Sequence, residues 1–183
     1  IIFGFSSIYH DFFPGLLEGL GETPTFGKYS VPNNYALESG IYIGNEQDLG
    51  SLVTLKYGIR LSVFNNIGPA TVYSYEGGTP VDSVSYPTNK IYNTYWEPEP
   101  RLGVVFKLNE TSSIKASYSK NVQYVQQASN STAGIPFSVW MPASPNVLPQ
   151  ISYQVATGYF KNFNNGMFQT SVEAYYKWIK NSV

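Results

Sequence analysis

The chain has 183 residues and a formal net charge of −1. Aromatic residues make up 16% and charged residues 13%, and there is no cysteine. A charge this close to zero gives no electrostatic case for nucleic-acid binding, and the lack of cysteine excludes disulfide frameworks, cysteine-ligated zinc and thiol catalysis. Soluble domains carry about 25% charged residues, so this composition favours a surface that is partly non-aqueous, such as a membrane interface rich in tyrosine.

Hydropathy along the chain gives no run of 18 apolar residues, so we predict no transmembrane helix. The sequence opens at Ile1, without an initiating Met or a signal peptide. We therefore expect either a processed chain or a fragment of a longer protein.

Seven segments show apolar and polar residues in alternation, the period of a β-strand. They lie near residues 1–12, 36–48, 51–65, 100–108, 113–123, 151–161 and 167–180. The third segment is the clearest, with an apolar face that runs from Val53 to Val63. Such a face spans about 11 residues, the length of a transmembrane strand, whereas most globular strands have about 5–6 residues.

The opposite faces of these strands are polar, as the lumen wall of a membrane barrel would be. The candidates for lumen-facing side chains are Lys56, Arg60, Arg101, Lys107 and Glu173, with Glu38, Glu46, Lys115 and Lys177 beside them. One interpretation is that they contact a plug or a passing solute. The other is that they are a solvated, mutually paired wall.

Short and long connections alternate between the strands. The short ones lie near 49–50, 109–112 and 162–166, and the long ones near 13–35, 66–99 and 124–150. In an up-and-down meander this places all short turns on one side and all long loops on the other, as in outer-membrane barrels with short periplasmic turns and long extracellular loops. A soluble β-sandwich is the alternative with a similar strand pattern.

The predicted fold is therefore all-β: an antiparallel, up-and-down transmembrane β-barrel of which one domain, residues 1–183, contains about seven consecutive strands. Seven strands do not close a bacterial barrel, which has an even number. A 22-stranded transporter barrel at this spacing needs roughly 570 residues, so we expect the chain to be about a third of one.

Several segments resemble motifs of TonB-dependent outer-membrane receptors, in the order of that family. The stretch Trp96–Gly103 resembles the Glu-Pro-Arg motif that opens a barrel strand there, and Leu108–Ser119 resembles the turn and strand that follow it. Further resemblances lie at Pro149–Tyr159, Ser171–Lys177 and Leu55–Leu61. Gln150 and Gln154 stand where many members have Glu, and the Arg-Asp-Gly-Ser-type turn of the glycan-importing branch is not found.

The resemblance implies an active importer for a scarce solute of the siderophore, cobalamin, peptide or glycan class. Its energy would come from TonB of the inner-membrane motor, through a plug that is absent from this sequence. The implied partners are outer-membrane lipid, TonB, the solute and a surface lipoprotein. The alternatives are a passive porin, a structural barrel subunit of an envelope complex, and a soluble β-sandwich adhesin.

Few residues suggest chemistry. His10 is the single histidine, and we expect it to form a solvated pair with Asp11 at the mouth of the first long loop. We predict no catalytic residues, metal site or cofactor, because metal sites need several convergent ligands and no Gly-x-Ser-x-Gly elbow is present. The last long loop holds the candidates for solute contact: Tyr124, Gln126, Phe137 and Trp140.

Overall fold

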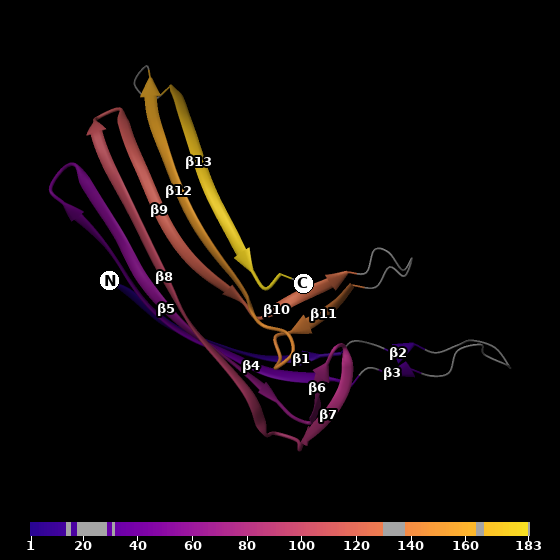
Figure 1. The fold of residues 1–183 in the computed structure, drawn as a ribbon. Helices are drawn as coiled ribbons and strands as arrows, with labels where there is room; N and C mark the ends of the chain where they lie inside the picture. The colour runs from indigo at the N-terminus through magenta and orange to yellow at the C-terminus, as the bar shows by residue number, and fades with distance from the viewer. Residues whose placement is uncertain (14–15, 18–28, 31, 130–137, 164–166, 183) are drawn as a thin grey trace.

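The computed structural model describes residues 1–13, 16–17, 29–30, 32–129, 138–163 and 167–182. Seven long strands form one antiparallel sheet (Figure 1) in the order β1–β4–β5–β8–β9–β12–β13. These strands are β1 (Ile2–Phe12), β4 (Asn34–Leu49), β5 (Val53–Ile67), β8 (Ile91–Asn109), β9 (Ser112–Gln123), β12 (Gln150–Phe163) and β13 (Phe168–Lys180). Each long strand pairs with the next along the chain, so the predicted all-β antiparallel meander is confirmed.

Three two-stranded hairpins lie in the long connections. They are formed by β2 (Leu16–Leu17) with β3 (Tyr29–Ser30), β6 (Ala70–Glu76) with β7 (Thr79–Tyr86), and β10 (Val125–Ser129) with β11 (Ser138–Pro142). All three lie at the same end of the sheet in Figure 1, which we call the long-loop end. The opposite end, where β4 joins β5 and β8 joins β9, is the short-turn end. The described strands form no second large sheet that could complete a β-sandwich.

Strand β8 is much longer than the sequence pattern suggests. It begins at Ile91 rather than near residue 100 and includes a proline-rich stretch that the sequence analysis assigned to a loop. The Lys107 N–H donates to the Leu52 carbonyl at 2.7 Å, so N–H groups of odd-numbered β8 residues point to β5 and those of even-numbered residues point to β9. Pro98 and Pro100 are even-numbered, and therefore the N–H groups that proline lacks are lost only toward β9.

The pairing pattern confirms this asymmetry. Strand β8 pairs with β5 from Ile91 to Phe106, whereas its ladder with β9 begins only at Arg101, opposite Ser119. Along the proline-rich stretch β8 is thus an edge strand toward β9, the position in which a sheet tolerates proline. The alternation of apolar and polar residues is hard to recognise around Pro98 and Pro100, which explains why the predicted start of β8 was too late in the sequence.

The sheet has one apolar and one polar face. Ile59 lies between Ile43 and Pro100 on neighbouring strands, whereas the next residue, Arg60, lies between Tyr42 and Glu99. Large apolar side chains remain exposed on the apolar face, including Ile43 at 54% and Ile59 at 48%. Exposed apolar areas of this extent mark a surface that meets lipid or a partner. No helix among the described residues is long and apolar enough to cross a membrane.

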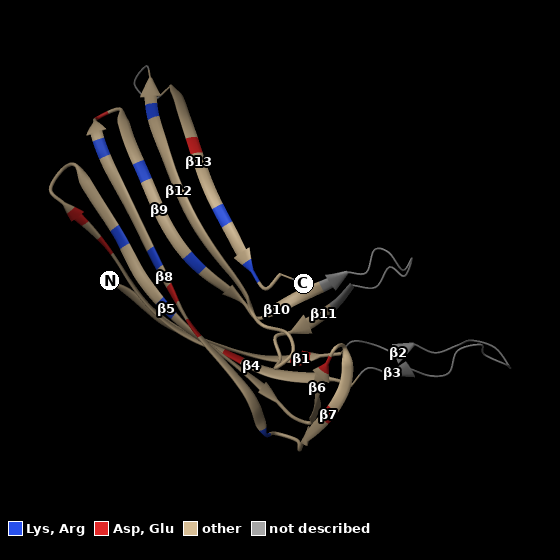
Figure 2. Ribbon diagram, viewed as in Figure 1, with Lys and Arg blue, Asp and Glu red and all other residues tan. Residues whose placement is uncertain are grey.

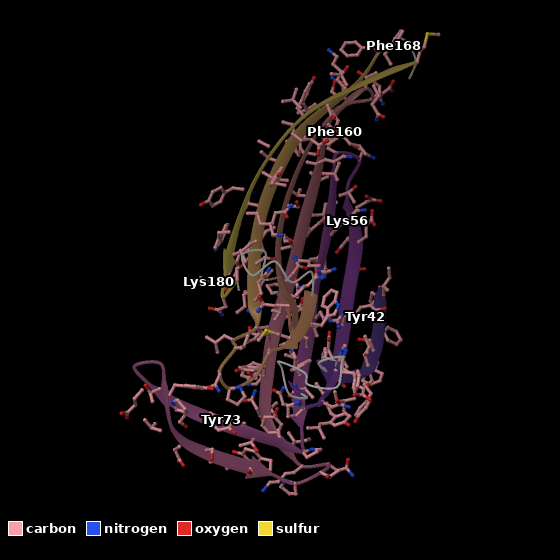
Figure 3. All side chains as sticks on the ribbon, turned by 90° about the vertical axis from the view of Figure 1, so that its right-hand side faces the viewer. Tyr42, Lys56, Tyr73, Phe160, Phe168 and Lys180 are labelled. Atoms are coloured by element: carbon pink, nitrogen blue, oxygen red, sulfur yellow. The ribbon has the colours of Figure 1, made fainter. Side chains whose placement is uncertain are left out.

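Buried hydrophobic residues gather on the polar face, at the long-loop end. We call them the anchor cluster: Phe12, Ala36, Phe64, Tyr124 and Ala143. Its members come from β1, β4, β5 and the segments that flank the β10–β11 hairpin. The core therefore lies where a loop folds onto the sheet, while the curved remainder of the sheet, seen in profile in Figure 3, has side chains on two open faces.

A matched pair of substitutions tests which face meets lipid. Ala116 lies on the apolar face opposite Val104 and Thr157, and Ser117 lies on the polar face opposite Gly103 and Ala156. In the full-length protein, Ala116→Arg should cost about 2–4 kcal/mol near the bilayer centre and prevent insertion into lipid vesicles, whereas Ser117→Arg should insert normally. Equal insertion of both variants, measured by protease protection and gel migration without heating, would contradict the assigned faces.

Candidate functional site

All five predicted lumen residues lie on the polar face of the sheet. Lys56 and Arg60 come from β5, Arg101 and Lys107 from β8, and Glu173 from β13. Lys and Arg occur along the length of the strands in Figure 2, and Asp and Glu occur both near the short turns and on β8. The polar wall thus carries both signs of charge along the strands, as in the pair of Lys56 with Glu46.

A charge network crosses four strands of this wall. It consists of His10, Glu38, Arg60 and Glu99, from β1, β4, β5 and β8. His10 Nε2 lies 3.3 Å from Glu38 Oε2, and the Arg60 guanidinium lies 3.8 Å from Glu38 Oε1 and 3.6 Å from Glu99 Oε1. Glu99 is only 5% exposed. A buried carboxylate needs a counter-charge and hydrogen-bond donors, and Arg60 supplies the charge.

Glu99 also compensates for the broken ladder. Its Oε2 accepts a hydrogen bond from the Val122 N–H of β9 at 3.3 Å. The hydrogen-bonded ladder between β8 and β9 ends at Arg101. If the same register continued, Pro98 would lie opposite Val122. The Glu99 side chain therefore occupies the space between two strands that the flanking prolines hold apart, and it satisfies a β9 backbone donor there.

Two glycines allow the large polar-face side chains to lie flat on the sheet. A Cβ on Gly40 would lie 2.9 Å from Arg60 Nε, and a Cβ on Gly4 would overlap the Tyr42 ring. Since no Cβ is present, the Arg60 guanidinium reaches across to β1, where it donates to Ser6 Oγ at 3.4 Å. The space beside these side chains is a groove of about 670 Å³ whose lining includes Tyr42, Lys56, Arg60, Arg101 and Ser119.

The remaining predicted wall residues are more exposed. Lys56 Nζ lies 3.0 Å from Glu46 Oε2, with both side chains more than half exposed, so the pair contributes at most about 1 kcal/mol. Arg101 donates to Asn121 Oδ1 at 3.1 Å, and Glu173 accepts from Ser171 at 3.3 Å. Lys107 lines a separate shallow groove near the β8–β9 turn.

The last long loop is anchored to the polar wall through Tyr124. The Tyr124 ring stacks on Phe64 at a centroid distance of 4.9 Å and an angle of 8°. Its hydroxyl lies 2.9 Å from Ser62 Oγ, and Ser62 Oγ donates to the Glu97 carbonyl at 3.3 Å. Either hydroxyl of this pair can be the donor, and Tyr124 Oη also lies 3.5 Å from the Ser62 carbonyl, to which it can donate. This chain of hydrogen bonds joins the loop to β5 and β8.

Other polar bonds hold the far end of the same loop. Asn66 Nδ2 donates to the Ala143 carbonyl at 2.8 Å, and Tyr95 Oη donates to the Ser144 carbonyl at 2.8 Å. Asn146 Nδ2 donates to the Tyr73 carbonyl at 2.9 Å, which connects the loop to the β6–β7 hairpin. The β10–β11 hairpin is therefore tied down at both ends over the polar face.

The four predicted contact residues have different positions. Tyr124 and Gln126 are 3% and 5% exposed, and their contacts position the loop: Gln126 Nε2 donates to the Leu148 and Asn181 carbonyls at 3.3 Å each. Trp140 on β11 is 55% exposed and presents its ring to solvent. Phe137 lies outside the described residues.

His10 differs from its predicted setting. It lies within β1 and not in a solvated loop. There it contacts Glu38, and its ring stacks on Phe12 at a centroid distance of 5.5 Å. Glu99, Ser62 and Asn66 are further buried residues of the wall, which the sequence pattern did not indicate. For Glu99, the prolines on either side of it were the sequence feature that could have indicated its unusual position. The described residues contain no group of His, Asp and Glu arranged to hold a metal ion.

Replacing the glutamate of the Arg60–Glu99 pair or of the Lys56–Glu46 pair with glutamine separates the contributions of the two ion pairs to stability. Glu99→Gln removes the buried counter-charge of Arg60 and weakens the acceptor for Val122, so the free energy of unfolding should fall by about 1–3 kcal/mol. Glu46→Gln, in the exposed pair with Lys56, should change it by less than about 1 kcal/mol. Urea unfolding of the full-length protein from lipid vesicles measures both, and an equal effect of the two variants would rule out a special role for Glu99.

Burial raises the pKa of the Tyr124 hydroxyl to about 12; the Ser62 hydrogen bond lowers it, and Glu99, Glu97 and Glu38 raise it. The protonated form is thus the one the folded state prefers. Its contribution to stability is complete below pH 10 and is lost as the pH rises through about 12.

Tyr124→Phe should accordingly accelerate hydrogen exchange in the β10–β11 hairpin about fivefold at neutral pH, because about 1 kcal/mol of hydrogen bonding is lost. It should also remove the tyrosinate absorbance step near pH 12. Tyr175→Phe is the control, since Tyr175 is 75% exposed on the same face. Unchanged exchange in Tyr124→Phe would show that the hairpin is held without this hydroxyl.

Comparisons with known proteins agree with this architecture. A solved structure described as the FrpB iron transporter from Neisseria meningitidis (F3-3 variant) is similar, with a TM-score of 0.53 and 19% identity. The match covers 84% of this chain and 20% of that one, so the chain spans about a fifth of the length of that transporter. No curated protein matches. Residues 3–183 match the family described as TonB dependent receptor-like, beta-barrel, and the chain therefore belongs to the TonB-dependent receptor β-barrel family.

Proposed function

We propose that this chain is the wall of an outer-membrane active transporter that imports a scarce solute, rather than an enzyme. The observation that carries the proposal is the β10–β11 hairpin, whose two flanking residues, Tyr124 and Ala143, are buried against the polar face at the long-loop end of an otherwise amphipathic sheet. A loop fixed over the interior of a barrel narrows its mouth and offers side chains to an entering solute. Membership of the TonB-dependent receptor family supports the same function.

In the proposed orientation the long loops are extracellular and the short turns periplasmic, the arrangement common to outer-membrane barrels. The apolar face then meets lipid, and the polar face lines the interior. A solute of the siderophore, cobalamin, peptide or glycan class would first meet the loop hairpin, where Trp140 is exposed. It would next meet the charge network and the groove beside Arg60 and Arg101.

We further propose that Lys56, Arg60, Arg101, Lys107 and Glu173 contact either the solute or a plug supplied by another part of the protein. The open groove and the hydrogen-bonding capacity of Arg101, which makes no carboxylate pair among the described residues, support this assignment. Energy would reach the plug from TonB of the inner-membrane motor, and a surface lipoprotein could deliver oligomeric solutes.

Energised uptake separates this function from that of a passive porin or a structural barrel. In cells that express the full-length protein, labelled ferric siderophores, cobalamin, peptides and oligosaccharides should be tested with and without a protonophore. Active transport predicts that uptake of one class depends on the protein and collapses when the proton gradient is removed. Uptake that persists without the gradient would indicate a porin, and no protein-dependent uptake would indicate a structural role.

Two exposed tryptophans then test the site. For the transported solute, Trp140→Ala should raise the half-saturating concentration about tenfold, since an aromatic contact of about 1–1.5 kcal/mol is lost. Trp96→Ala should leave it unchanged, because Trp96 is 67% exposed on the apolar face opposite Val63. If the Trp140 variant transports with the original half-saturating concentration, the β10–β11 hairpin is not part of the solute site.

A further inference from the structure

Charged residues mark both ends of the apolar face on the last two strands. On this face of β12 and β13, Lys180 lies at the long-loop end, opposite Ile151, and Lys161 lies at the short-turn end. Between them the described residues of this face are all uncharged. Lys161 lies ten positions after Ile151, which is about 33 Å along a strand. At a tilt of about 40° this gives a band about 25 Å tall, the height expected for a lipid-facing surface.

At the long-loop border the cation does not stand alone. Tyr153 and Trp178 face each other across β12 and β13 and stack at a centroid distance of 5.3 Å and an angle of 14°. Lys180 Nζ lies 5.7 Å from the centre of the Tyr153 ring, and Lys120 Nζ, from β9, lies 6.0 Å from it. Two ammonium groups therefore flank one aromatic pair at the level where the apolar band ends.

The two lysines differ in their other contacts. Lys120 Nζ lies 2.6 Å from Glu97 Oε2, and its side chain is 13% exposed. Lys180 makes no ion pair among the described residues and is exposed. The net charge of Lys120, Glu97 and Lys180 is +1, so an anion placed beside Lys180 meets an uncompensated cation, with Lys120 as a second donor close by.

The backbone beside Lys180 is held in place. Asn181, with a positive φ of 57°, donates from Nδ2 to the Pro149 carbonyl at 3.0 Å, and its own carbonyl accepts from Gln126 Nε2 at 3.3 Å. These bonds fasten the end of β13 to the start of β12 and to the loop. The aromatic pair and Lys180 are thus preorganised, which lowers the entropy lost when a ligand is bound.

From this arrangement we propose that Lys180, Lys120, Tyr153 and Trp178 form a binding site for the phosphate of an anionic lipid headgroup, in the leaflet at the long-loop end. The stacked rings occupy the interfacial zone that aromatic side chains prefer. Lys180 supplies the charge that attracts the phosphate, and the uncharged band below accommodates the acyl chains. The site depends on insertion in a membrane and is independent of the transport function proposed above.

Native mass spectrometry of the full-length protein in detergent tests this site with three probes: dioleoylphosphatidic acid, dioleoylphosphatidylcholine and inorganic phosphate. The native protein should retain the anionic lipid preferentially. Lys180→Gln should weaken that binding about fivefold, the equivalent of about 1 kcal/mol for one Lys near the surface. Lys180→Arg should restore it, and Lys177→Gln, on the polar face of the same strand, should not change it.

Three outcomes would overturn the proposal. The first is equal retention of the two lipids by the native protein, and the second is undiminished binding of phosphatidic acid by Lys180→Gln. The third is displacement of the lipid by millimolar inorganic phosphate with the same dependence on Lys180, which would make a free anion the ligand. Each variant is first checked for correct insertion by gel migration without heating. The double variant Lys120→Gln with Lys180→Gln should bind the anionic lipid more weakly than Lys180→Gln alone.

Discussion

The ladder of backbone hydrogen bonds between successive strands is the constraint on which this structure depends. A bilayer offers no partner to an N–H or a carbonyl group, so a strand that crosses it must bond to both neighbours. Six consecutive antiparallel pairings give each strand from β4 to β12 in the sheet two neighbours, while β1 and β13 pair on one side among the described strands. Because the side-chain period of a strand is two, the same ladder sends successive residues to opposite faces of the sheet, which separates Ile59 from Arg60.

The hydrogen-bonded ladder is interrupted beside the charge network of the polar wall. Pro98 and Pro100 end the pairing of β8 with β9 at Arg101, and Glu99 enters the gap to accept the Val122 N–H. Glu99 in turn needs Arg60, which needs Glu38, which also meets His10. One interruption in backbone pairing therefore explains a charge network that extends over four strands, directly beneath the anchored loop.

The loop and the wall form one unit at the long-loop end. Tyr124 bonds to Ser62, and Ser62 bonds to the Glu97 carbonyl, so the hairpin rests on the same segment of β8 that contains Glu99. Glu97 also binds Lys120 near the Tyr153 and Trp178 pair. The proline-containing stretch of β8 thus connects the polar wall, the loop anchored on it and the aromatic pair on the apolar face.

Sequence by itself determined the seven strands of the main sheet, the antiparallel meander, the two faces and the family, because alternation and the spacing of turns are local and repeat seven times. It placed Lys56, Arg60, Arg101, Lys107 and Glu173 on one face for the same reason. It did not predict the three hairpins in the long connections. Only the tertiary structure decided that β8 starts at Ile91, that His10 and Glu99 join a network, and that Tyr124 is buried while Trp140 is exposed. Those features depend on contacts between residues far apart in the chain, such as Tyr124 with Ser62, for which no local pattern exists.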